Sequence, residues 1–217
     1  MQWVLIGVTR VARISAGVRD GVSVMISSVR QVDAETLLAG LDRVRESPRA
    51  TGEVRLLVLR PAPGEREAVT KATLDRIEGV TGDNWLARGN PRTPDGSADP
   101  AAQVTVMNIR AAELVAGGPE RIPLAGDQVY VDFDVSIDNL PPGSLLVIGD
   151  TVLRVSEKPH TGCQKFVERF GVDAMRFVNS PTGRRLRLRG VNTRVVTPGV
   201  VRVGDQVTTS LHATDAS

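Results

Sequence analysis

The sequence predicts a mainly β fold, a barrel or a sandwich, with a few short helices. Two observations support this: many short runs rich in β-branched residues, and Gly-Asp pairs placed just before several of those runs. The pairs are Gly126-Asp127, Gly149-Asp150 and Gly204-Asp205, each followed by one polar residue and then by valine. Because tight turns between strands favour Gly and Asp, we interpret these pairs as turns and not as active-site residues.

The first half of the chain predicts one helix, one buried strand and one long loop. Apolar residues recur at helical spacing over 33–46, with Asp33 in place to cap the start of the helix. Residues 53–60 form a short apolar run that ends before a proline, which is typical of a buried strand. Residues 88–100 contain three prolines, so we expect neither a helix nor a strand to cross them.

Strands dominate the second half. Apolar and polar residues alternate over 129–135, which is the period of a strand with one buried face. Further short strands are expected at 145–148, 152–155, 195–196 and 200–203. The sequence lacks a sustained strand–helix–strand alternation, a Gly-rich phosphate loop and a dinucleotide-binding fingerprint, which argues against nucleotide hydrolysis and Rossmann-type dehydrogenation.

Composition narrows the class of protein. A chain of 217 residues with 41% hydrophobic and 24% charged residues is typical of a globular protein with one main core. Aromatic residues make up only 3% and the formal net charge is +2, so we expect no nucleic-acid partner. A single cysteine cannot form an intramolecular disulfide, and we therefore expect a reducing, cytoplasmic location.

The first residues predict an extension outside the main fold. The apolar stretches of residues 1–24 are interrupted by charged side chains, so they are too broken for a membrane span and lack a clean secretory h-region. A basic, acid-poor leader is an alternative. We expect residues 1–24 to form a loosely attached or disordered extension, and residues 25–217 to form a single domain. No membrane partner is expected.

The stretch around the only cysteine, Cys163, carries the candidate chemistry. Thr161 and Gln164 stand at capping-box spacing, which predicts a short helix with Cys163 in its first turn. Backbone N–H groups at that helix start, together with nearby basic side chains, would favour a thiolate, which is both a nucleophile and a soft metal ligand. The basic side chains near Cys163 in sequence are Lys158, His160, Lys165 and Arg169.

Other interpretations of this stretch are weaker. A lone cysteine is often buried and inert, but polar and basic neighbours are not typical of an apolar burial site. A closed zinc site is disfavoured because Cys163, His160 and His212 are the chain's only cysteine and histidines. A cysteine protease is weakly supported, because His160 lies too close along the chain to be judged a catalytic partner from sequence alone.

Arginines cluster at residues 184–194, where they alternate with apolar residues. On a strand, Arg185, Arg187 and Arg189 would share one face, while Leu186 and Leu188 would face the core. A solvated strand face is the simple interpretation. An anion site is the more specific one, because guanidinium groups bind phosphate through paired hydrogen bonds.

Together, these stretches resemble the MOSC domain, the C-terminal module of molybdenum cofactor sulfurases, which also occurs as stand-alone bacterial proteins. The resemblance covers about residues 32–207. The matching stretches are Gly82-Asp83-Asn84-Trp85 with Arg88-Gly89, Asp132-Phe133-Asp134 leading to Asn139-Leu140-Pro141-Pro142-Gly143, Pro159 to Phe166, and Arg189-Gly190-Val191-Asn192 running into Pro198-Gly199 and Gly204-Asp205. The resemblance implies a closed, mostly antiparallel β-barrel similar to the one inserted in pyruvate kinase.

The same resemblance implies a site for the molybdenum cofactor, molybdopterin. Cys163 would be the metal ligand or would carry a persulfide, with His160 beside it as a second catalytic residue. The residues implied to bind the cofactor are Lys165, Arg187, Arg189, Asn192 and Asn139. Larger members of the family add a pyridoxal-phosphate domain or a domain that covers the cofactor; we expect neither here, and hence no pyridoxal phosphate.

Three functions remain open at this stage. The first is a molybdenum-dependent oxidoreductase that reduces N-hydroxylated compounds, as stand-alone MOSC proteins and the mitochondrial amidoxime-reducing component suggest; it would need a redox partner protein. The second is a non-catalytic sulfur carrier, which would hold a persulfide on Cys163 and need a sulfur-donor protein. The third is a barrel that keeps the family framework for an unrelated small ligand. Each of them implies a small-molecule substrate or cofactor.

Overall fold

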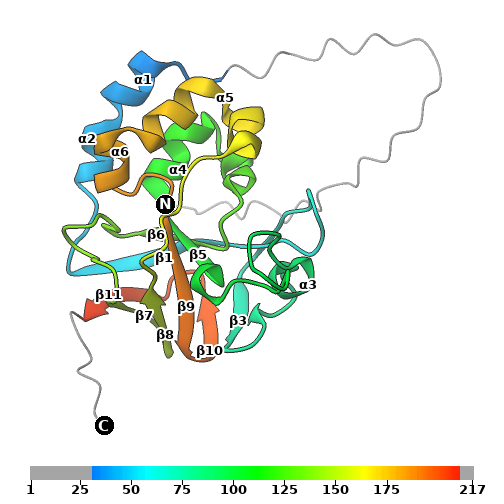
Figure 1. Cartoon of the computed structure of the whole chain (residues 1–217). Coiled ribbons are helices and arrows are strands. Elements are labelled where there is room, and N and C mark those ends of the chain that lie inside the picture. The colour runs from blue at the N-terminus through cyan, green and yellow to red at the C-terminus, as the bar shows by residue number, and fades with distance from the viewer. Residues whose placement is uncertain (1–30, 211–217) are drawn as a thin grey trace, which may run out of the picture.

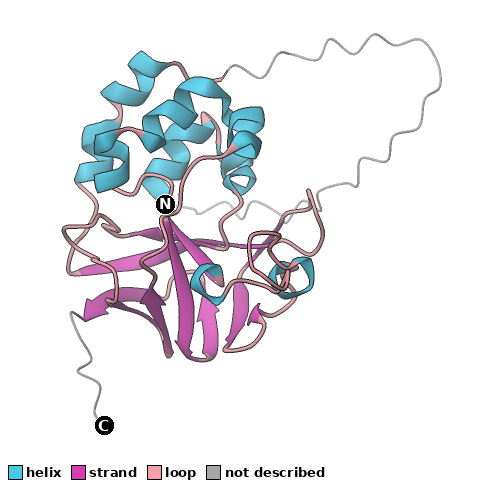
Figure 2. Ribbon diagram, viewed as in Figure 1, coloured by secondary structure: helices cyan, strands magenta, loops and turns pink. Residues whose placement is uncertain are grey.

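Seven strands close into a barrel in the computed structural model, which describes residues 31–210 (Figures 1 and 2). Around the barrel the order is β1 (Thr51–Leu59), β6 (Val129–Asp132), β5 (Val104–Asn108), β9 (Val191–Thr197), β8 (Thr151–Val155), β7 (Leu145–Ile148) and β11 (Gln206–Ser210). Antiparallel pairing of β1 with β11, from Thr51 opposite Thr208, closes the ring. Because β5 and β6 pair in parallel and the other neighbours in the ring are antiparallel, the predicted closed, mostly antiparallel barrel is confirmed.

Short strands extend this barrel. Strand β2 (Glu67–Val69) pairs with β1, and a separate sheet joins β10 (Gly199–Arg202), β3 (Lys71–Asp75) and β4 (Gly79–Val80). The turn at Gly149-Asp150 joins β7 to β8, as the sequence predicts.

A layer of helices covers one end of the barrel in Figure 2. It contains α1 (Ala34–Ala39), α2 (Leu41–Arg45), α4 (Ile109–Ala116), α5 (Gln164–Asn179) and α6 (Pro181–Arg185). The 3-10 helix η2 (Pro119–Ala125) packs against α4, whereas α3 (Trp85–Arg88) and η1 (Pro100–Ala102) lie elsewhere on the barrel. Asp33 caps α1 through the backbone N–H of Thr36, as predicted, but the single helix expected over 33–46 is two helices that meet at Gly40.

Two hydrophobic clusters stabilise these layers. One fills the barrel and includes Phe133, Leu146 and Leu153, while the other lies between the barrel and the helices and includes Tyr130 and Phe170. Along β6, Val129 and Val131 belong to the first cluster and Tyr130 to the second. The prediction of a single buried face for this strand is therefore wrong, because helices cover its outer face as well.

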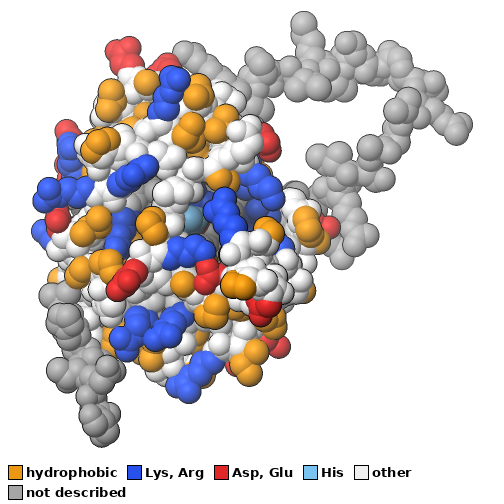
Figure 3. All heavy atoms as spheres, in the orientation of Figure 1, with side chains coloured by type: hydrophobic (Ala, Val, Ile, Leu, Met, Phe, Trp, Pro, Cys, Tyr) orange, Lys and Arg blue, Asp and Glu red, His pale blue; other side chains and the backbone are white. Residues whose placement is uncertain are grey.

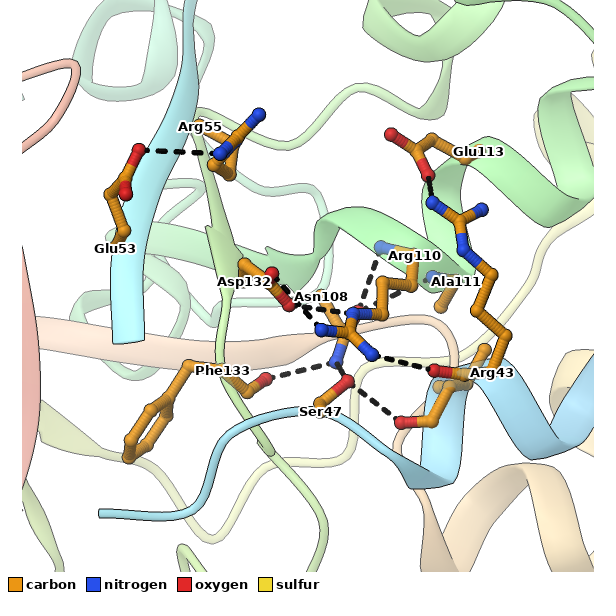
Figure 4. Close-up of polar contacts among 11 residues, drawn as sticks. Arg43, Ser47, Glu53, Arg55, Asn108, Arg110, Ala111, Glu113, Asp132 and Phe133 are labelled. Atoms are coloured by element: carbon orange, nitrogen blue, oxygen red, sulfur yellow. Dashed lines mark hydrogen bonds and ion pairs between the residues drawn. The ribbon is translucent and has the colours of Figure 1, made fainter. Parts of the chain in front are cut away.

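Polar contacts fasten the helical layer to the barrel (Figure 4). At the end of β5, the Asn108 side chain accepts hydrogen bonds from the backbone N–H groups of Arg110 and Ala111 and donates to the carbonyl of Phe133 at 2.9 Å. Arg110 on α4 forms paired hydrogen bonds with Asp132 on β6, at 2.7 and 3.2 Å. Asp132, the first residue of the Asp-Phe-Asp stretch, thus joins β6 to α4.

The arginine stretch is not a strand. Arg184 and Arg185 end α6, residues 186–189 form turns, and β9 begins only at Val191. The prediction of one shared arginine face is wrong because this turn sends the side chains to different places: Arg185 is exposed, Arg187 is half-buried and Arg189 is buried. Turns with a residue at positive φ, here Arg187 at 50°, do not keep the alternation of a strand.

The predicted extension, residues 1–24, lies outside the described residues, as does His212. Within 31–210, none of the helices combines the length and the hydropathy needed to cross a membrane.

Candidate functional site

Cys163 is exposed and lies at the start of α5. The helix begins at Gln164, so Cys163 is its N-cap residue; the predictions that Cys163 lies in the first turn and that Thr161 caps the helix are wrong. Its backbone carbonyl accepts hydrogen bonds from the N–H groups of Phe166 and Val167, at 2.9 and 3.1 Å. The thiol makes no capping hydrogen bond.

Beside the thiol lies a cleft of about 290 Å³, which we call the arginine cleft. Six Lys and Arg side chains line it together with Cys163 and His160, and none of its lining residues is acidic. The six are Arg60, Arg66, Arg88, Lys165, Arg169 and Arg189. Figure 3 shows Lys and Arg side chains gathered on one face of the molecule, around a hollow in which a histidine is visible.

The Gly82-Asp83-Asn84-Trp85 stretch holds one of these arginines in place. Arg60, at the end of β1, forms paired hydrogen bonds with the buried Asp83 carboxylate, at 2.7 and 2.9 Å. A third bond from Arg60 reaches the carbonyl of Gly126 at 3.0 Å. Gly126 has a φ of 88°, which glycine adopts without strain, and a Cβ there would lie 3.3 Å from terminal nitrogens of both Arg66 and Arg169. Glycine therefore lets the Arg66 and Arg169 side chains lie close to position 126.

A second buried carboxylate, Asp127, holds Arg189. Asp127 is fully buried and forms an ion pair with the Arg189 guanidinium, which also donates to the carbonyl of Ala125 at 2.9 Å and lies over the ring of Phe166. The other Asp127 oxygen faces Nδ1 of His160 at 3.4 Å. Burial, and next the nearby Arg189 charge, lowers the pKa of His160 from 6.5 to about 3, so this imidazole is neutral at pH 7.

The remaining four basic side chains of the cleft, Arg66, Arg88, Lys165 and Arg169, form no ion pair with any described residue. Burial, followed by the Arg169 and Arg60 charges, lowers the pKa of Arg66; burial, followed by Arg60, lowers that of Arg88. Both guanidinium groups nevertheless stay charged at pH 7, since an arginine pKa starts above 12. The cleft is therefore strongly positive and suited to an anion.

Buried polar atoms point to the same conclusion. Nε of Arg66, Nε of Arg189 and Oδ1 of Asn84 are buried without a hydrogen-bond partner among the described residues. Each of these residues lines the arginine cleft. Buried polar groups in native proteins are nearly always paired, so these atoms beside a cleft favour a bound ligand that accepts from the two arginine N–H groups and donates to the Asn84 oxygen.

The structure brings together some of the residues predicted for the site and separates others. Lys165, Arg189 and His160 line the arginine cleft with Cys163, whereas Arg187 and Asn192 line a neighbouring cavity. His160 lines both cavities. Asn139 lines neither cavity, and its amide donates to the carbonyls of Arg49 and Asp134.

Several cleft residues lie outside the candidates chosen from the sequence. Asp127 was interpreted as a turn residue, yet it holds Arg189 in the cleft. Arg60, Arg66 and Arg88 stand far from Cys163 in the chain, so local patterns give no sign of them. The one available signal was Asp83 within the matched Gly-Asp-Asn-Trp stretch, because a buried acid in a basic chain needs a cationic partner.

One comparison with known families finds a match. The family model of the MOSC domain matches residues 103–208. The chain contains a MOSC domain over these residues. The matched range includes Cys163, His160, Lys165, Asp127 and Arg189, whereas Arg60, Asp83 and Arg88 precede it. Strand β1 and the segments that follow it, which precede the MOSC domain, therefore complete the arginine cleft.

Solved structures share the fold. The YuaD protein from Bacillus subtilis aligns with a TM-score of 0.57 and 18% identity, over 76% of this chain and 100% of that chain. YiiM from Geobacillus stearothermophilus aligns with a TM-score of 0.52 and 14% identity, over 76% of this chain and 78% of that chain. At these identities the likeness concerns the fold alone. A search among curated proteins finds no match.

Proposed function

We propose that this protein binds the molybdenum cofactor in the arginine cleft, with Cys163 as metal ligand, and reduces N-hydroxylated small molecules. The observation that carries the proposal is an exposed thiol beside a cleft lined by six basic and no acidic side chains. A thiolate is a soft metal ligand, and guanidinium groups suit the phosphate of a pterin cofactor.

The residues present fit such a group. Buried, unpaired donors on Arg66 and Arg189 need acceptors, which a phosphate or a pterin ring can supply. Within residues 31–210, no group of three or more His, Cys, Asp and Glu side chains is placed to hold a metal ion. A metal in the cleft would thus depend on Cys163 and on ligands that the cofactor itself brings.

The residues that line the cleft have separate roles in this proposal. When bound, the cofactor would supply two-electron redox chemistry. Cleavage of the N–O bond consumes two electrons and two protons and releases water, with the electrons delivered by an external reductant. His160, neutral at pH 7, can keep its proton on Nδ1 beside Asp127 and leave Nε2 to accept a hydrogen bond from substrate. Arg66, Arg88, Arg169 and Lys165 would hold the anionic part of the cofactor.

The test is metal content and activity of protein produced in a host with an intact molybdopterin pathway. We expect molybdenum near one atom per chain, and reduction of benzamidoxime to benzamidine with reduced viologen dye as electron donor. Cys163→Ser should lose both, because a neutral hydroxyl is a poor ligand for a soft metal site. Gln164→Ala, at the exposed neighbouring position, is the matched control and should keep both. Full molybdenum content in Cys163→Ser would contradict the proposal.

A second candidate function is the sulfur carrier. It is favoured by the exposure of Cys163, because a partner protein could reach the thiol without any opening of the fold. In that case the purified protein should lack molybdenum but accept a labile, cyanide-sensitive sulfur atom from a cysteine desulfurase. Cys163→Ser should abolish the labelling, whereas Gln164→Ala should not.

A further inference from the structure

A second cavity, of about 330 Å³, adjoins the arginine cleft and shares His160 with it. We call it the side cavity. Apolar side chains supply much of its wall, from the loop after β6, from the segment between β8 and α5, from α5 and from β9. They are Ile137, Pro142, Pro159, Val178 and Val191. Small-molecule sites are commonly concave, mostly apolar and at least 300 Å³ in volume, with a few polar groups that set orientation. The side cavity matches this description.

Arg187 is the polar group that stands out in the side cavity. It is half-buried, and its guanidinium donates to the carbonyl of Leu140. No carboxylate among the described residues lies within ion-pair distance of it, and burial alone lowers its pKa. A half-buried cation without an acidic partner is costly to keep, which favours a ligand that supplies the negative charge.

The backbone at Arg187 supports a functional role. Its φ of 50° makes it the only non-glycine residue at positive φ among residues 31–210. Such conformations cost free energy and cluster at functional sites, where surrounding contacts enforce them. Here, the turn between α6 and β9 directs the Arg187 side chain into the side cavity, away from Arg185 and Arg189.

Arg187 is better placed to pair with an anionic ligand than the other charged groups around the side cavity. Lys158 also lines it but is paired with Asp99. Arg184 and Glu157 are exposed at its edge. Asn192 is buried and donates from its amide to the carbonyl of Lys158, which fixes the wall beside His160.

We propose that the side cavity is the substrate subsite, and that it takes a small organic carboxylate whose apolar body lies against Ile137 and Val178 while its carboxylate pairs with Arg187. The proposal rests on the proposed function in one respect: the reacting end of that molecule would pass His160 into the arginine cleft. Binding itself requires only the side cavity.

The experiment measures binding to the full chain without cofactor, by calorimetry. The probes are 3-phenylpropionate and its neutral analogue 3-phenylpropanamide. We expect the carboxylate to bind about tenfold or more tightly than the amide, because hydrogen bonds to a charged group are worth more than neutral ones. Arg187→Met should abolish that preference and leave amide binding in place, and Arg187→Lys should restore part of it.

Control variants show which cavity binds the two probes. Arg185→Met, on the exposed neighbour, should keep the preference, and so should Arg88→Met in the arginine cleft. Ile137→Trp, which fills the side cavity at a partly exposed position, should weaken both probes. Equal binding of the two probes, or a preference lost with Arg88→Met and kept with Arg187→Met, would overturn the proposal. Because no molybdenum is involved, these outcomes are independent of the metal analysis that tests the proposed function.

Discussion

Acidification should destabilise the fold through His160 well before most carboxylates titrate. Burial and the Arg189 charge lower the pKa of this imidazole from 6.5 in the unfolded chain to about 3 in the folded protein. Between these values the unfolded state binds a proton that the folded state excludes, so stability is complete above pH 6.5 and falls as the pH drops toward 3. The free energy of unfolding should therefore decrease by about 2 kcal/mol between pH 7 and pH 5 through this residue.

The assay is urea denaturation at pH 7 and pH 5, followed by circular dichroism, for the wild type and His160→Gln. The variant removes the titrating group and should lose about 2 kcal/mol less than the wild type over the same interval. In proton NMR spectra the imidazole signals come from only two histidines, His160 and His212. The His160 imidazole signals should stay constant from pH 8 to pH 5. An equal pH dependence in the two proteins, or a His160 midpoint near 6.5, would refute the reasoning.

Three further predictions concern single contacts and the chain ends. Arg189→Ala should lower the free energy of unfolding by about 3 to 5 kcal/mol, because it leaves Asp127 buried and unpaired. Arg185→Ala, at an exposed residue, should hardly change it. Urea denaturation of both variants measures the two free energies. Arg88→Ala should weaken the binding of inorganic phosphate, measured by calorimetry, without changing the melting temperature; unchanged phosphate binding would argue against the arginine cleft as an anion site. A chain that begins at Met25 should melt within a few degrees of the full chain, because the barrel and its helices lie within 31–210; a large fall in melting temperature would contradict this.

Local patterns in the sequence predicted the structure correctly where few distant contacts intervene. Strands β7 and β8 and the turn between them follow from short apolar runs around Gly149-Asp150, and the Asp33 cap follows from its place before an amphipathic stretch. Local patterns failed where tertiary contacts override them. Alternation along β6 predicted one solvent-facing side, but the helical layer buries Tyr130. The expected arginine strand is a turn, in which Arg187 adopts a positive φ.

The sequence by itself predicted a β-barrel of the MOSC type and Cys163 as the candidate reactive residue, because turn residues, strand periodicity and a lone cysteine among basic residues are readable within a few positions. Only the tertiary structure decided which charges meet there. Arg60, Arg88 and Arg189 stand far apart in the chain and converge when the barrel closes, with Asp83 and Asp127 buried behind them. Long-range electrostatics depends on distance in space, which a strand pattern does not encode.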